Sequence, residues 1–148
     1  MQPFQRIAIT GKPGDQAVID TIRKLIHELD GRGLTVSLDE AIGDATGASA
    51  THPVASLDSL APRIDLLIVV GGDGTLLHAG KRVAAHQVPV LGINRGRLGF
   101  LVDVSPDRFD EIIRVIDGDC RVEERLVLEA RVVDDDGIVA HAPAINEV

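Results

Sequence analysis

The sequence has very few of the residues that would point to an extracellular or membrane protein. It contains a single cysteine, Cys120, so neither an internal disulfide nor a cysteine-rich zinc site can form, and a reducing, cytoplasmic compartment is expected. No apolar run approaches the roughly 20 residues of a membrane span, and the N-terminus lacks the pattern of a secretory signal. The sequence therefore predicts a cytoplasmic protein that does not enter a membrane.

Aromatic residues and positive charge are also scarce. Tryptophan and tyrosine are absent and phenylalanine occurs three times, so the core must be aliphatic and few side chains could stack on nucleic-acid bases. The 15 Lys and Arg residues are outnumbered by 23 Asp and Glu, which gives a formal net charge of −8. Because an acidic surface repels a phosphate backbone, we exclude nucleic acid as a partner. An anionic small ligand would need a local device such as a helix N-terminus or a metal ion.

Apolar runs alternate with segments of helical periodicity over the first 118 residues. The runs that predict strands are residues 6–10, 34–38, 65–70 and 89–93. Asp15 is suited to cap the first helix, which Gly31 and Gly33 should end. Ser105, followed by Pro106, is suited to begin the last helix, which should stop at Gly118. Residues 41–63 are rich in small residues and predict a loop with one short helix near residues 57–60. This alternation predicts an α/β fold with an open, mainly parallel sheet flanked by helices.

The pattern changes near residue 119. Residues 126–133 are strand-like, residues 134–137 form a turn signal, and a return strand begins at Ile138. We therefore predict an α/β domain over residues 1–118 and the beginning of a second, all-β domain over residues 119–148. The sequence stops inside an apolar segment, so we expect it to be a fragment of a longer protein.

The segment Gly71–Thr75, Gly-Gly-Asp-Gly-Thr, joins the predicted buried strand 65–70 to a helix. Its glycines let the backbone take a positive φ and let a ligand approach without meeting a Cβ. The following helix N-terminus favours an anion. A carboxylate repels phosphate, so Asp73 is explained if it holds a divalent cation or accepts a proton from an attacking hydroxyl. The structural alternative is a tight turn in which Asp73 is only a cap.

A second glycine-rich loop, Asn94–Leu101, follows the next predicted strand, and a structural turn is an equally good explanation of it alone. Neither the P-loop spacing nor the dinucleotide-binding Gly-x-Gly-x-x-Gly fingerprint is present. Both loops nevertheless follow consecutive parallel strands, at the edge where open α/β sheets bind ligands.

The two loops together resemble the NAD kinases, whose shared blocks are Gly-Gly-Asp-Gly-Thr and Asn-x-Gly-x-Leu-Gly-Phe-Leu. Asn146-Glu147 matches the Asn-acid pair that begins the second domain of that family. The similarity covers nearly the whole chain in order and spacing. Lipid kinases share the first block and phosphofructokinases carry a similar one. A lipid or sugar kinase, or a non-catalytic nucleotide-binding module, therefore remains an alternative.

The resemblance implies transfer of the γ-phosphoryl group of ATP to the 2′-hydroxyl of the adenosine ribose of NAD, which gives NADP. Polyphosphate could replace ATP as the donor. Asp73 would accept the hydroxyl proton. The residues implied to contact the nucleotide substrates are Gly72, Asp73, Gly74, Thr75, His78, Asn94, Asn146 and Glu147. No residue is implied as a dedicated metal ligand, but Mg²⁺ or another divalent cation is expected because both substrates are anions meeting an acidic protein.

Several further expectations follow from the resemblance. His78 stands where the family usually has a basic residue that contacts the substrate, although an exposed helical histidine is almost as good an interpretation. Candidate counter-charges, each of which could equally be an ordinary solvated residue, are Lys12, Lys81, Arg82, Arg95 and Arg97. The family is typically homo-oligomeric and continues into a larger β domain. We therefore expect negligible kinase activity from these 148 residues alone.

Overall fold

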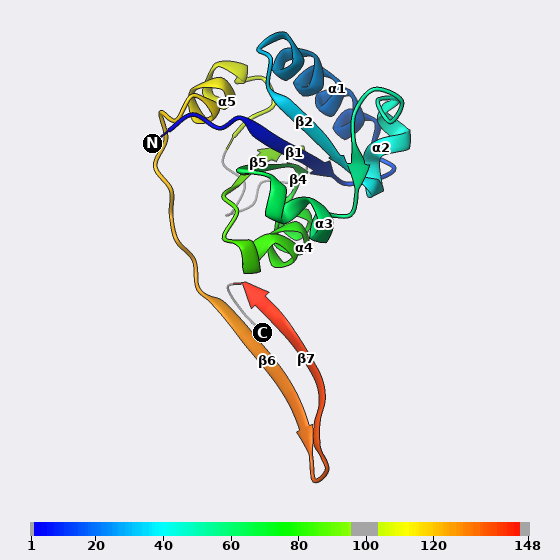
Figure 1. Cartoon of the computed structure of the whole chain (residues 1–148), viewed down its shortest axis with the longest axis vertical. Helices are drawn as coiled ribbons and strands as arrows, with labels where there is room; N and C mark the ends of the chain where they lie inside the picture. Colours follow the sequence, from blue (N-terminus) through cyan, green and yellow to red (C-terminus); the bar gives the residue numbers. More distant parts are fainter. Residues whose placement is uncertain (1, 96–103, 146–148) are drawn as a thin grey trace.

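The computed structural model describes residues 2–95 and 104–145 (Figure 1). Its larger sheet has five parallel strands in the order β3-β2-β1-β4-β5. The strands are β1 (Arg6–Gly11), β2 (Thr35–Asp39), β3 (Val54–Ala55), β4 (Leu66–Gly71) and β5 (Val90–Asn94). The predicted open, parallel α/β sheet is confirmed.

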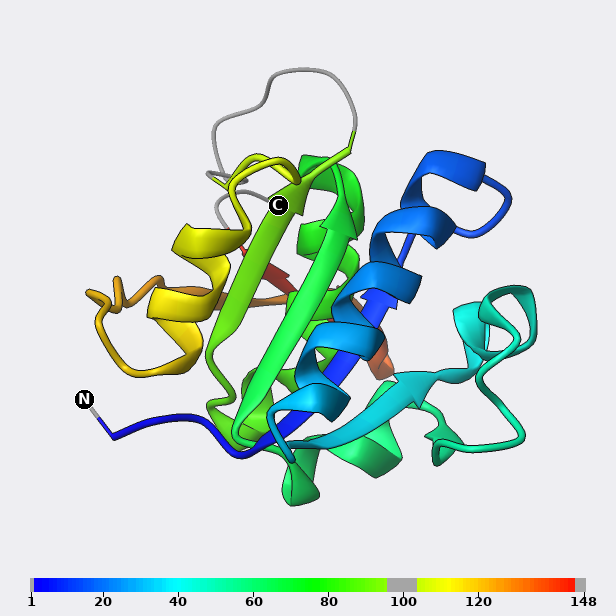
Figure 2. The same ribbon diagram turned by 90° about the horizontal axis from the view of Figure 1, so that it is seen from above.

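Helices cover both faces of this sheet (Figure 2). They are α1 (Gln16–Gly31), α2 (Glu40–Thr46), α3 (Leu57–Leu60), α4 (Asp73–Val83) and α5 (Phe109–Ile116), with 3₁₀ turns at Ala61–Arg63 and Ala84–His86. α1, α2 and α5 pack on one face, and α3 and α4 pack on the other. Every residue of β4 is buried, as a strand covered on both faces requires. Within the described ranges, no helix is long and apolar enough to cross a membrane.

Helix α1 begins and ends where the sequence predicts. The Asp15 carboxylate accepts a hydrogen bond from the backbone N–H of Ala17 (3.0 Å), which satisfies a donor that has no partner inside the helix. Gly33 adopts φ +74° just after the helix, a conformation that costs glycine little. Between these ends, one face of α1 is buried against the sheet.

The prediction of a loop over residues 41–63 is wrong at two places, where α2 and β3 form. Gly43 lies so close to β3 that a Cβ there would be 2.8 Å from Val54 Cγ1. Arg23 of α1 donates hydrogen bonds to the carbonyl oxygens of Thr46 and Ala45 at the end of α2. Small residues that disfavour a helix locally are therefore used for close packing, and contacts from distant segments decide the conformation.

The predicted start of the last helix is also wrong. Ser105 and Pro106 lie in a turn, in which Arg108 N–H donates to Ser105 O (3.0 Å), and α5 begins only at Phe109. Ser105 Oγ accepts from Asp107 N–H (3.4 Å), so its side chain closes the turn and does not cap a helix. The predicted stop is confirmed, since α5 ends at Ile116 and Gly118 follows with φ +89°.

The last strands, β6 (Val127–Asp134) and β7 (Gly137–Ile145), pair antiparallel as a separate two-stranded sheet. The predicted hairpin is therefore confirmed, with Gly137 at φ +129° where the chain turns back. The hairpin projects from the helix-covered sheet and touches it near α4 (Figure 1). The division of the chain into two domains near residue 118 stays a prediction.

Candidate functional site

The candidate site lies where the central strands β1 and β4 end side by side. The chain leaves β1 toward α1 on one face of the sheet and leaves β4 toward α4 on the other. Such a divergence is the point at which open α/β sheets bind ligands. Lys12 N–H donates to Val70 O (3.2 Å), which ties the turn after β1 to the end of β4.

The glycines of Gly71–Thr75 have different structural roles. Gly71 is the last residue of β4, and a Cβ there would be 2.9 Å from Thr75 Oγ1, so glycine lets the first turn of α4 fold onto the strand end. At Gly72 and Gly74, no described atom would lie within 4 Å of a Cβ. None of the three has a positive φ, so the prediction of a left-handed backbone is wrong here, whereas at two of them the described residues leave space that a ligand could approach.

Asp73 is the first residue of α4, directly after Gly72 as the N-cap. A negative charge at this position interacts favourably with the helix dipole. Gly74 and His78 are both exposed and lie one helical turn apart, whereas Thr75 is half-buried beneath the turn. The helix start therefore presents a carboxylate and an uncrowded backbone at the edge of the sheet.

Asn94 comes to the same edge from β5. It is the register partner of Gly71, so the two strands end together. The backbone N–H of Asn94 donates to Val104 O (2.8 Å), and the next residue, Arg95, donates its N–H to Gly71 O (3.0 Å). The structure thus brings Gly72, Asp73, Gly74, Thr75 and Asn94 together.

The remaining residues of the second loop, 96–101, and the pair Asn146 and Glu147 lie outside the described residues. Ile145, the last described residue, packs against α4: a Cβ at Gly80 would be 3.2 Å from its Cδ1 atom. Strand β7 therefore leads toward the helix that begins with Asp73.

Residues 7–119 match the model of the ATP-NAD kinase N-terminal domain. The chain belongs to the NAD kinase family. It is 43% identical to the NAD kinase of Halorhodospira halophila and 42% identical to that of Chromohalobacter salexigens, over 99% and 100% of its length. It spans about half the length of these curated relatives, 48% and 50%.

A solved structure has the same fold. The crystal structure of yeast NADH kinase complexed with NADH superposes with a TM-score of 0.80 at 20% sequence identity. The match covers 97% of this NAD kinase-family chain and 47% of the yeast chain. The helix-covered sheet and the hairpin that follows it therefore occur together in that enzyme as well.

The basic residues that could neutralise a phosphate differ in this NAD kinase-family chain: some bond to other side chains and others are exposed. Arg82 donates a hydrogen bond to the Asp58 carboxylate (3.1 Å), which raises the pKa of its guanidinium and fastens α4 to α3. Arg95 donates through Nε to Thr21 Oγ1 of α1. Lys12 and Lys81 are exposed, one after β1 and one on α4, whereas Arg97 lies outside the described residues.

Two structural contributors were not predicted. Thr21 was missed because a threonine on the buried face of a helix carries no signal of its own in the sequence. Gly80 had a signal: a glycine in a helix interior costs about 1 kcal/mol relative to alanine, so it usually has a packing reason. Here that reason is the approach of Ile145.

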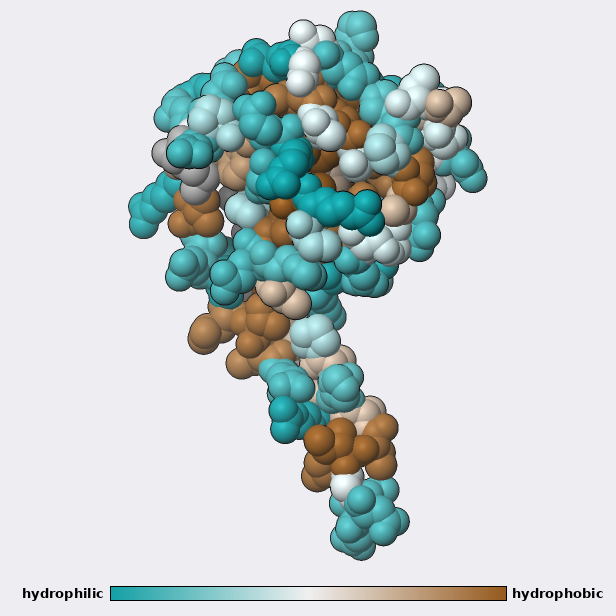
Figure 3. Space-filling view, viewed as in Figure 1, coloured by the Kyte–Doolittle hydropathy of each residue, from teal (hydrophilic) through white to brown (hydrophobic). Residues whose placement is uncertain are grey.

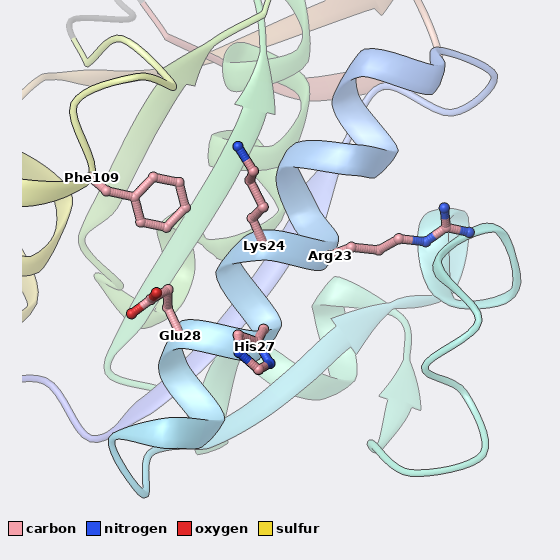
Figure 4. A pocket seen from close by; sticks show the side chains of 5 residues that line it. All are labelled: Arg23, Lys24, His27, Glu28 and Phe109. Carbon is pink, nitrogen blue, oxygen red and sulfur yellow. The ribbon is translucent and has the colours of Figure 1, made fainter.

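A hollow on the surface lies elsewhere, between α1 and α5 (Figure 4). It encloses about 470 Å³ and is lined by Arg23, Lys24, His27, Glu28 and Phe109. Its α1 residues lie from the middle of that helix onward, and the helix runs away from the strand ends where Asp73 lies. A second hollow of about 380 Å³ separates the end of α4 from the hairpin.

Proposed function

We propose that this chain supplies the catalytic carboxylate of an NAD kinase. In the active protein, this chain would be joined to a segment that corresponds to the remaining half of the NAD kinases it matches. We call that protein the complete kinase. It would transfer the γ-phosphoryl group of ATP to the 2′-hydroxyl of the adenosine ribose of NAD. The observation that carries the proposal is the position of Asp73, at a helix N-terminus and at the divergence of β1 and β4, in a chain of this family.

Asp73 would act on the attacking hydroxyl. The 2′-oxygen forms a bond to the γ-phosphorus while the bond from that phosphorus to the β–γ bridging oxygen breaks, so ADP leaves and the hydroxyl proton passes to the Asp73 carboxylate. Phosphoryl transfer has a loose transition state, so alignment and charge neutralisation contribute more than the strength of the base. A carboxylate fixed on the first turn of a helix meets the requirement for alignment.

The neighbouring residues would hold the nucleotides. The open space at Gly72 and Gly74 lets a phosphate or ribose approach backbone N–H groups at the start of α4, where the helix dipole favours an anion. Thr75, His78 and Asn94 would add side-chain hydrogen bonds from the same edge. Asn146 and Glu147 are included as nucleotide contacts because they match the pair that the family carries there.

A divalent cation, Mg²⁺ by preference, would accompany ATP. Among the residues that the structure describes, no group of three His, Cys, Asp or Glu side chains could hold a metal ion. Mg²⁺ usually binds through one or two carboxylates and the substrate phosphates, so the proposal does not require such a group. The cation would neutralise charge on the transferred group.

The wider setting belongs to the same proposal. ATP or polyphosphate would be the donor, NAD the acceptor, and the complete kinase a cytoplasmic homo-oligomer. Residues 119–148 would begin an all-β domain that completes the NAD site. The exposed apolar side chains of the hairpin support this, since further strands would cover them.

The test is NADP formation by the complete kinase from NAD and MgATP, followed with an NADP-specific dehydrogenase. Asp73→Asn should lower turnover by roughly 10²–10⁴, the usual contribution of a general base. Asp135→Asn, in the exposed hairpin turn, is the matched control and should retain the wild-type rate. A near-wild-type rate for Asp73→Asn would contradict the assignment.

Two further assays test which acceptor is phosphorylated and whether this chain is active alone. Diacylglycerol offered in place of NAD should not be phosphorylated, which separates this enzyme from the lipid kinases that share the first motif. The 148-residue chain alone should form negligible NADP. Vigorous NADP formation by that chain would show that no further segment is needed.

A further inference from the structure

Arg95 makes two contacts that link three elements at the strand ends. Its backbone N–H donates to Gly71 O (3.0 Å), at the end of β4. Its side chain reaches α1, where Nε donates to Thr21 Oγ1 (2.9 Å). One residue after β5 therefore holds the end of β4 with its main chain and the first helix with its side chain.

The acceptor of the side-chain bond is itself fixed. Thr21 is 2% exposed, and its hydroxyl donates to Ala17 O (2.9 Å), so its lone pairs face Arg95 and not solvent. A ligand in solution cannot reach this hydroxyl. The Nε proton of Arg95 is thus committed to a buried protein oxygen, which is a different role from that of a phosphate counter-charge.

The geometry points to Arg95 as a positioning residue for Asp73. Gly71 precedes Asp73 by two residues, and the strand end is fixed on one side by the hydrogen bond from Arg95. The bond to Thr21 keeps Arg95 in place by joining it to α1, which packs on the opposite face of the sheet from α4. Arg95 then sets the position of the catalytic carboxylate without contacting substrate. The kinetic test of this inference rests on the proposed function.

Thr21→Val tests this directly, because valine has nearly the shape of threonine, lacks the hydroxyl and changes no charge. In the complete kinase we expect kcat to fall about tenfold to a hundredfold, as for a misplaced catalytic group, while KM for NAD and ATP changes less than about twofold. Arg95→Gln should show the same pattern, and the double variant should be no worse than the stronger single one. Thr21→Ser, which keeps the hydroxyl, should restore most of the rate.

Thr46→Val is the matched control. Thr46 is also buried, and its hydroxyl donates to Gly43 O (2.8 Å), but it lies on α2, and within the described part of the chain its side-chain hydrogen bonds reach only Gly43 and Ala48. It should lose stability to a similar extent and leave kcat unchanged. Equal loss of kcat in this control would show that any buried hydroxyl has the same effect, which would overturn the inference.

A measurement independent of activity separates this inference from the proposed function. Amide hydrogen exchange over residues 69–75 should accelerate in Thr21→Val and in Arg95→Gln, and should not change in Thr46→Val. Unchanged exchange in the first two variants would overturn the inference, even if the wild-type protein formed no NADP. A rise in KM for ATP in Arg95→Gln alone, with Thr21→Val unaffected, would instead make Arg95 a counter-charge.

Discussion

Both sheets of this molecule contain aliphatic strand residues, and the two sheets differ in what covers those residues. Every residue of β4 is buried between two helical layers, and Val70 is 0% exposed. In the hairpin, Val133 is 65% exposed and Leu128 is 42% exposed. Figure 3 shows apolar patches on the hairpin, with polar side chains between them, where the hairpin projects from the helix-covered sheet.

The comparison shows that strand sequence alone does not make a stable sheet. Burial of apolar area supplies the main driving force for folding, and a lone two-stranded ribbon buries little of it. The helix-covered sheet can therefore hold Asp73, the proposed catalytic carboxylate, in a fixed place. The hairpin depends for its position on its contact with α4.

Truncation of a buried side chain should give the largest difference in the free energy of unfolding between the two sheets. Ile68→Ala removes a side chain that is 0% exposed in β4, and we expect the free energy of unfolding to fall by about 3 kcal/mol. Val133→Ala in the hairpin should change it by less than about 0.5 kcal/mol. Urea denaturation of this 148-residue chain, followed by far-UV circular dichroism, measures both. Equal losses would mean that the hairpin is as well packed as the sheet.

Neighbouring glycines should give the next largest difference. Gly71→Ala places a Cβ 2.9 Å from Thr75 Oγ1 and should lower the free energy of unfolding by about 1–3 kcal/mol. Gly72→Ala meets no described atom within 4 Å and should leave unfolding nearly unchanged. In the complete kinase, however, Gly72→Ala should reduce NADP formation, because its methyl group occupies space proposed for the nucleotide. Full activity with normal stability would show that the ligand does not approach there.

The smallest effect is expected where the two regions touch. Gly80→Ala gains about 1 kcal/mol of helix propensity and brings a methyl group to 3.2 Å from the flexible tip of Ile145. The free energy of unfolding should therefore change by less than about 1 kcal/mol, while hydrogen exchange near the end of β7 accelerates. Unaltered exchange in β7 would show that Ile145 adjusts without moving the strand.

The sequence predicted best where local signals agree with the final packing. The buried run of β4, the Asp15 cap and the Gly118 stop each act within a few residues and were read correctly. The start of α5 was misjudged because the same residues, Ser105 and Pro106, suit a turn as well as a helix cap. Prediction from one sequence could not distinguish these uses.

The sequence predicted the motif of the site but not the contacts that hold the motif in place. The segment Gly71–Thr75 carries its own signal, and its position at the end of a buried strand follows from the hydrophobic pattern. Helix α2 and the bond from Arg95 to Thr21 depend on segments 22 and 74 residues apart in the sequence, whose contacts no local pattern records. The structure adds these long-range contacts to the local ones.

Helix α4 is fixed at several points along its eleven residues. Its first turn packs on Gly71, its Arg82 is bonded to Asp58 of α3, and its Gly80 receives Ile145 from the hairpin. A helix held in this way loses little conformational entropy when a ligand arrives, so most of the ordering cost is met during folding. Binding free energy is then available for aligning the reacting groups, which is the physical meaning of preorganisation.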